Sequence, residues 1–194
     1  MRPDSVNPSE MRTFLTEMPV HNDFLAGRFT LEMGYPWITH GAILALERIL
    51  KRREKGEFKI LEMGSGGSTI YFSKRCKTLL SLEHNKKWYE KVKKALPKPS
   101  NVELIYNSVR KLNDVIKQQE DGYFDIVFSD FGYSYEARMT LLKTSLIKLK
   151  RFGWLVVDNY LLCDRDIDLG AFDVYTFDMF QYSGRGTRIY KKLY

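Results

Sequence analysis

The sequence has few of the residues that crosslink a chain or ligate a metal. Its two cysteines, Cys76 and Cys163, are too few for a disulfide framework or a four-cysteine metal site. Its three histidines are scattered and lack the spacing of a zinc site. No apolar run approaches membrane-spanning length, and the first residues lack the apolar core of a secretory signal. These absences predict a reduced, cytoplasmic protein that has no membrane partner.

The charge balance leaves an acidic partner open. The formal net charge of +7 raises the question of nucleic acid. In the helix predicted over 86–96, however, the lysines lie opposite the face formed by Trp88 and Val92. This is the pattern of an amphipathic helix with a solvated face. A nucleic-acid partner is therefore an alternative that the sequence does not favour.

From residue 58 onward, strand and helix patterns alternate along the chain. Strands are predicted at 58–62, 78–82, 102–106, 124–129 and 154–158, and helices near 68–75, 86–96, 109–119 and 135–150. The strands are mostly apolar, which is typical of strands covered by helices on both faces. Two strands over 172–180 and 187–194 follow as an antiparallel pair.

These patterns predict an α/β fold. It is a doubly wound, mostly parallel seven-stranded sheet with helices on both faces and an antiparallel C-terminal hairpin. The whole chain, 1–194, is predicted to form one domain. Within it, 1–38 would be an N-terminal helical or lid segment that includes a helix from Pro8 to about Met18. Residues 39–160 would be the cofactor-binding core, and 161–194 the C-terminal hairpin.

Polar residues end each of the five predicted parallel strands. They are Glu62, Glu83-His84, Asn107-Ser108, Asp130 and Asp158-Asn159. In a parallel sheet these ends share one edge, where the ligand crevice forms. The turn Gly64-Ser65-Gly66-Gly67 follows the first strand and opens a helix, as in nucleotide-type pockets. Each polar residue alone is more often a turn or helix cap, but the set together with this turn favours a ligand site.

The charge of Glu62 limits which class of ligand the predicted site can bind. Glu62 stands just before the glycine-rich turn, where a dinucleotide would bring its pyrophosphate. Two negative groups in a partly dry crevice repel each other. A donor that has cationic centres and no phosphate suits this position better, and S-adenosylmethionine (SAM) fits that description.

Three segments resemble motifs of the class I SAM-dependent methyltransferases, and the resemblance spans roughly residues 37–160. They are Ile60–Ser68, Leu82-Glu83-His84 and Phe128-Ser129-Asp130. The resemblance implies that Glu62 lies near the methionine amino group, that Glu83 accepts from both ribose hydroxyls and that His84 flanks the adenine. It implies that Asp130 lies beside the transferring methyl, as the catalytic candidate. It also implies further cofactor contacts at Gly64, Ser65, Gly66, Ser68, Thr69, Asn107, Ser108, Trp37 and Thr39.

Asp130 and the pair Asp158-Asn159 lie at the ends of neighbouring predicted strands. Asp158 follows Asp130 by 28 positions. This arrangement resembles metal-dependent O-methyltransferases of the catechol and caffeoyl-coenzyme A type. The resemblance implies that Asp130, Asp158 and Asn159 hold Mg²⁺ or Ca²⁺, ions that prefer oxygen ligands. In the alternative, Asp158 and Asn159 shape the loop and meet substrate without an ion.

The leading hypothesis is a SAM-dependent methyltransferase that acts on an oxygen of a small-molecule acceptor. Tyr133, Asn159 and Tyr160 are the predicted substrate-side residues, from their positions after the strands. The second hypothesis is an RNA- or protein-modifying methyltransferase, favoured if lysines and arginines cluster beside the pocket mouth. The third is an NAD-dependent oxidoreductase or a non-catalytic nucleotide-binding module; it is disfavoured because Thr69 replaces the third glycine of the dinucleotide fingerprint.

Overall fold

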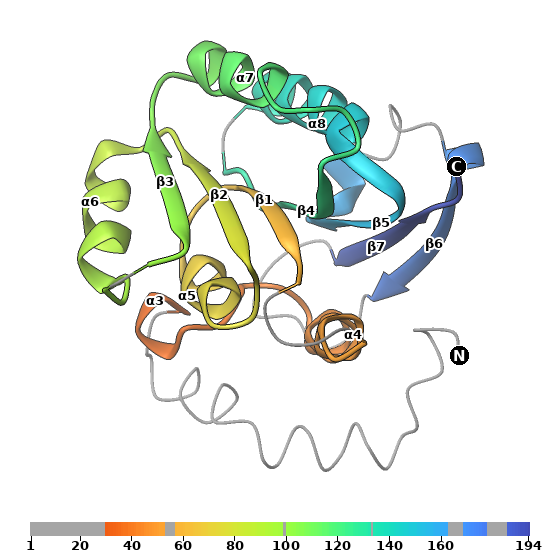
Figure 1. Cartoon of the computed structure of the whole chain (residues 1–194), viewed down its shortest axis with the longest axis horizontal. Helices are drawn as coiled ribbons and strands as arrows, with labels where there is room; N and C mark the ends of the chain where they lie inside the picture. Colours follow the sequence, from red (N-terminus) through yellow and green to blue (C-terminus); the bar gives the residue numbers. More distant parts are fainter. Residues whose placement is uncertain (1–29, 53–56, 99, 133, 163–168, 178–185) are drawn as a thin grey trace.

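The computed structural model describes residues 30–52, 57–98, 100–132, 134–162, 169–177 and 186–194 (Figure 1). The helix predicted near 8–18 lies outside these residues, as does most of the predicted segment 1–38. Among the helices that the structure describes, none is long and apolar enough to cross a membrane.

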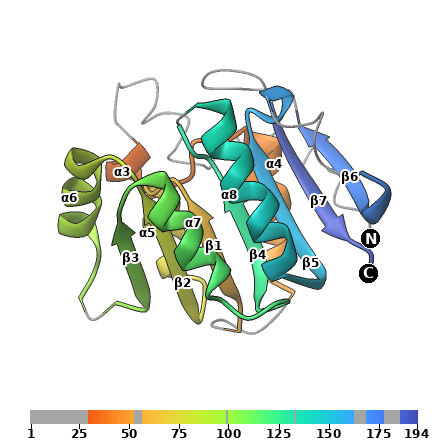
Figure 2. The same ribbon diagram turned by 90° about the horizontal axis from the view of Figure 1, so that it is seen from above.

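Seven strands form one sheet in the order β3-β2-β1-β4-β5-β7-β6 (Figure 2). The first five strands in this order are mutually parallel: β3 (Val102–Tyr106), β2 (Thr78–Glu83), β1 (Lys59–Met63), β4 (Phe124–Ser129) and β5 (Leu149–Asp158). Strand β7 (Thr187–Lys192) is antiparallel to β5, and β6 (Phe172–Phe177) is antiparallel to β7. The structure thus confirms the predicted mostly parallel sheet with an antiparallel C-terminal pair.

Helices cover both faces of the sheet. In Figure 1, α4 (His40–Leu50) and α5 (Gly67–Ser73) lie on one side, and α7 (Val109–Lys117) and α8 (Tyr135–Lys148) on the other. Helix α6 (Lys86–Ala95) contacts β2, β3 and α5 at one end of the sheet, and the short α3 (Thr30–Met33) contacts α5 and α6. The 3₁₀ turns η1 (Tyr160–Leu162) and η3 (Leu169–Ala171) follow β5.

The core is divided by the sheet into two layers. Ile60, Phe128 and Val156 point to the layer that contains α4 and α5. Their neighbours in sequence, such as Leu61 and Val127, point to the layer that contains α7 and α8. Because side chains alternate between the faces of a strand and both faces are buried, both sets must be apolar. This explains the continuous apolar runs in the sequence.

The junction between α8 and β5 differs from the prediction. Helix α8 ends at Lys148 and β5 begins at Leu149, whereas the helical pattern was expected to continue to 150 and the strand to begin at 154. Leu149 pairs with Phe124, and Trp154 pairs with Ile126, so residues 150–153 form a bulge. Pairing with β4 decides the boundary here, because the helical periodicity alone counts Leu149 as part of the helix.

Candidate cofactor and active site

A cavity of about 390 Å³ lies at the carboxyl ends of β1, β2 and β4. Of the predicted cofactor contacts, eight line it: Trp37, Gly64, Ser65, Gly66, Ser68, Glu83, His84 and Asp130. Gly67, Asn85, Trp88 and Gly132 complete the lining. The glycine-rich turn thus shares one cavity with the polar ends of β2 and β4, whereas the polar ends of β1, β3 and β5 do not line it.

Gly64 allows the turn after β1 to pass close to the turn after β4. Its φ is +91°, and a Cβ at this position would lie 2.2 Å from the carbonyl oxygen of Asp130. The two turns are joined by a backbone hydrogen bond from the Asp130 amide to the carbonyl of Met63, at 2.9 Å. Only glycine combines this conformation with this approach. Asp130 is thus fixed against the glycine-rich turn.

Glu83 is held by four donors. Its Oε1 accepts from the amides of His84 (2.8 Å) and Asn85 (2.7 Å). Its Oε2 accepts from the amide and the hydroxyl of Ser65, at 3.2 and 3.1 Å. The carboxylate is only 4% exposed and still lines the cavity. These contacts fix a negatively charged acceptor at the pocket wall.

Glu62 lies beneath the glycine-rich turn and is fully buried, outside the residues that line the cavity. Its Oε2 accepts hydrogen bonds from the hydroxyls of Thr69 and Ser81, and the Thr69 hydroxyl also accepts from the amide of Gly66 at 2.8 Å. Burial raises the pKa of Glu62 to about 7, which the hydroxyls only partly oppose. The expected repulsion of a phosphate therefore depends on Glu83, which lines the cavity, more than on Glu62.

The raised pKa of Glu62 makes stability depend on pH. Between pH 4.5 and about 7 the folded protein binds this proton more tightly than the unfolded chain, so the contribution of Glu62 to stability falls as pH rises. Glu62→Gln removes this dependence and is expected to gain up to ~3 kcal/mol over the wild type between pH 4.5 and pH 8. Urea unfolding of both proteins at the two pH values measures the difference. An equal difference at both values would contradict it.

Trp88, which the helical pattern places on the apolar face of α6, also lines the cavity. Asn85 caps α6 by accepting from the Trp88 amide at 3.1 Å, and the Trp88 indole Nε1 donates to the carbonyl of Ser65. The ring stands 3.8 Å from the position of a Cβ on Gly66. One feature of the sequence indicates that Trp88 can line the cavity: it lies in the first turn of the helix that follows Glu83, an acid of the predicted pocket.

Besides Glu62, four predicted cofactor contacts lie outside the cavity lining. Thr39 occupies the N-cap position of α4, and its amide donates to Thr187 Oγ1 at 3.2 Å. Ser108 precedes α7, and its amide donates to the Asn107 side chain at 3.0 Å. Thr69 supports Glu62 as described above. Cofactor contacts by Thr39, Thr69, Asn107 and Ser108 stay predictions, and the observed hydrogen bonds give each residue a role in a turn, cap or buried network.

A buried arginine joins the ends of β4 and β5. The guanidinium of Arg138, from α8, donates to the carbonyls of Phe131 (2.9 Å) and Asp158 (2.7 Å), and it lies 4.0 Å from Asp130 Oδ1. Arg138 is 5% exposed, whereas the Asp130 side chain remains 29% exposed. Burial and the negative charge of Asp158 raise the pKa of Asp130 well above its usual range, and Arg138 opposes them. Asp130 is thus suited to accept a proton.

The predicted metal ligands already have other partners. Asp158 Oδ1 accepts from the Thr187 hydroxyl at 2.8 Å, and Oδ2 accepts from Asn159 Nδ2 at 2.6 Å. Asn159 therefore turns its amide nitrogen, not its oxygen, toward Asp158, and Arg138 supplies positive charge beside Asp130. Burial raises the pKa of Asp158 to about 6. This donor set does not fit Mg²⁺ or Ca²⁺.

The predicted substrate-side residues are only partly described. Tyr133 lies outside the described residues. Asn159 has a φ of +53°, a left-handed conformation that asparagine tolerates. Tyr160 is 5% exposed, and Arg188 lies over its ring at 3.9 Å. Substrate contacts by these three residues stay predictions.

Residues 61–160 match the model of a family described as a methyltransferase domain. No curated protein matches the sequence. Solved structures share the fold at low identity. A putative methyltransferase from Streptococcus mutans in complex with SAH has a TM-score of 0.61 and 17% identity, with 78% of this chain and 97% of that chain covered. An rRNA methylase from Streptococcus thermophilus has a TM-score of 0.60 and 14% identity, with 78% and 96% covered.

A more distant likeness is to fibrillarin from Aeropyrum pernix with natively bound SAM, at a TM-score of 0.55 and 14% identity, with 71% of this chain and 67% of that chain covered. The family match includes the glycine-rich turn, Glu83, Asp130 and Asp158, and it spans 100 of the 194 residues. The chain belongs to this methyltransferase-domain family and is a class I SAM-dependent methyltransferase.

Proposed function

We propose that the enzyme transfers the methyl group of SAM to an oxygen of a small-molecule acceptor held beside Asp130. The observation that carries this proposal is a half-buried carboxylate with a raised pKa in the same cavity as the glycine-rich turn and Glu83. A hydroxyl acceptor must lose a proton as it is methylated, and such a carboxylate is a suitable base.

Each residue of the cavity has a defined part in this proposal. When bound, SAM supplies an activated methyl group, so the chain mainly positions the acceptor and excludes water. Glu83 accepts from the ribose hydroxyls, and the glycine-rich turn lets the backbone approach the cofactor. Asp130 takes the acceptor proton, and Arg138 holds the Asp130 turn against the end of β5. No metal ion is required, because Arg138 provides the cation beside Asp130.

A second candidate is methylation of RNA, and the surface of α6 favours it. Asn85 and Trp88 line the cavity, and Lys86, Lys87 and Lys91 of the same helix are exposed. These lysines place positive charge beside the mouth of the cavity, which is the arrangement that the RNA hypothesis predicts. The structures of similar fold include an rRNA methylase.

The two candidates are separated by tracing the methyl label. The protein is incubated with methyl-labelled SAM and with phenols, polyols and sugars in one arm and total RNA in the other. We expect label in a small-molecule product, at a rate that EDTA leaves unchanged. Label in RNA, with an affinity that falls steeply with salt, would contradict the small-molecule proposal and support the second candidate. Loss of transfer in EDTA would contradict the metal-free site.

A further inference from the structure

A second cavity of about 230 Å³ lies at the amino ends of the parallel strands, opposite the carboxyl ends that hold the cofactor cavity. It is formed where β1 and β4 begin, by the bulge of β5, by the end of β7 and by the C-terminal end of α4. Its lining comprises Ile49, Arg52, Phe58, Asp125, Lys150–Trp154 and Lys191. Because β1 has five residues, the two cavities lie roughly 16 Å apart along the strands. This second cavity is called the bulge cleft below.

The bulge cleft is strongly cationic. Its lining contains four cations, Arg52, Lys150, Arg151 and Lys191, and one carboxylate, Asp125, which leaves a formal charge of +3 (four minus one). Asp125 is 2% exposed and is bound within the protein, to Lys150 Nζ at 2.8 Å and to the Lys59 amide at 2.9 Å. The acid therefore fixes Lys150 in the lining of the cleft. Such a concentration of positive charge attracts phosphate groups.

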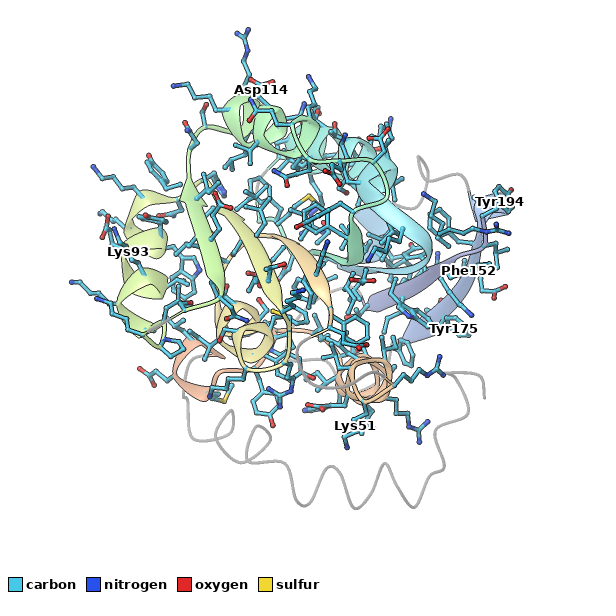
Figure 3. The ribbon with its side chains drawn as sticks, viewed as in Figure 1. Lys51, Lys93, Asp114, Phe152, Tyr175 and Tyr194 are labelled. Atoms are coloured by element: carbon cyan, nitrogen blue, oxygen red, sulfur yellow. The ribbon has the colours of Figure 1, made fainter. Side chains whose placement is uncertain are left out.

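Aromatic rings accompany these cations. The ring of Trp154 is nearly buried, with the Arg52 guanidinium 5.8 Å and the Lys191 ammonium 5.7 Å from its centre. Arg151 lies 4.8 Å from the ring centre of Phe152. Phe152 itself is 55% exposed, and it projects on the β5–β7 side of the molecule, across the sheet from Lys93 of α6 (Figure 3).

Phe152 is unfavourable for folding in two ways. Its φ of +60° is a left-handed conformation that bulky side chains rarely adopt. Its exposed ring gains little from burial. A glycine or asparagine would serve the bulge better, so the ring is explained more readily by a ligand than by the fold.

We propose that the bulge cleft binds a nucleotide, with its phosphate on Arg52, Arg151 and Lys191 and its base on Phe152. Guanidinium groups suit phosphate oxygens, and stacking on a phenyl ring accepts any base. The site is separate from the cofactor cavity, so it does not depend on the identity of the methyl acceptor. Its nucleotide comes either from a single-stranded RNA or from a free mononucleotide.

Fluorescence anisotropy with a labelled single-stranded RNA oligonucleotide tests the proposal. The double variant Arg151→Gln/Lys191→Gln is expected to bind more weakly and to lower the slope of log affinity against log salt by about 1.4, for two lost phosphate contacts. Phe152→Ser is expected to weaken binding by about fivefold or more, without changing the slope. The matched control is Arg110→Gln/Lys143→Gln, which removes the same charge from exposed positions on α7 and α8 and should leave the affinity close to that of the wild type.

Competition by unlabelled AMP distinguishes the two sources of nucleotide: displacement of the RNA indicates that a free nucleotide suffices, and its failure indicates a strand. Equal weakening by the cleft variant and the control would overturn the proposal, because binding would then depend on net charge alone. It would also be overturned if Lys86→Gln/Lys87→Gln on α6 abolished binding and the cleft variants did not. SAM affinity by calorimetry checks that each variant is folded; if the double variant fails, the exposed Arg151→Gln alone provides the test.

Discussion

Glu83→Ala is expected to weaken SAM binding about a hundredfold, which corresponds to ~3 kcal/mol. The carboxylate lines the cavity and would accept from two ribose hydroxyls; hydrogen bonds to a charged group contribute about 1.5–3 kcal/mol each. Isothermal titration calorimetry with SAM measures the change. Because Glu83 also ties β2 to the glycine-rich turn through Ser65, circular dichroism should accompany the titration to verify the fold.

Ser65→Ala is the matched control for Glu83→Ala. In the structure each Glu83 oxygen already accepts two hydrogen bonds, so the ribose hydroxyls must share these acceptor sites or displace a donor. The Ser65 hydroxyl is the donor that can rotate away, whereas the three backbone amides cannot. Removal of this hydroxyl should therefore leave SAM affinity unchanged or slightly tighter. Unchanged affinity in Glu83→Ala, or an equal loss in Ser65→Ala, would contradict the assignment of Glu83 to the ribose.

The sequence identified the residues whose position follows directly from topology. Gly64, Glu83 and Asp130 each lie at or just after the end of an apolar strand, and the carboxyl ends of parallel strands lie on the same side of a sheet. Their proximity can therefore be predicted without any knowledge of side-chain packing. The contact of Trp88 with the cavity does not follow from the sequence, because helical periodicity reports only which face is apolar, and a tryptophan on that face can either pack or line a cavity.

The positions of Glu62 and Arg138 depend on contacts that the sequence does not encode locally. Glu62 turns beneath the glycine-rich turn because hydroxyls from α5 and β2, on Thr69 and Ser81, bind it there. Arg138 follows the pattern of a polar helix position, yet it is buried because it satisfies carbonyls at the ends of two strands, seven and twenty residues away. Arg138 also explains why an Asp-Asp-Asn set that resembles a metal site has a different use in this chain.

Asp130→Asn is expected to lower kcat by about 10² to 10⁴, the usual contribution of a general base, while SAM affinity changes little. The amide keeps the size and polarity of the side chain but cannot accept the acceptor's proton. In the wild type the rate should rise with pH as Asp130 loses its proton, and its raised pKa places this rise at higher pH than for an ordinary aspartate. In Asp130→Asn this rise should be absent.

Arg138→Met provides an independent test, because Arg138 lowers the pKa of Asp130 while burial and Asp158 raise it. Without the guanidinium, the rise of rate with pH should move to still higher pH, and kcat at high pH should recover toward the wild-type value. A purely structural role for Arg138 would lower the rate at every pH without moving the profile. Wild-type turnover in Asp130→Asn, or an unmoved profile in a folded Arg138→Met, would show that the acceptor proton leaves by another route.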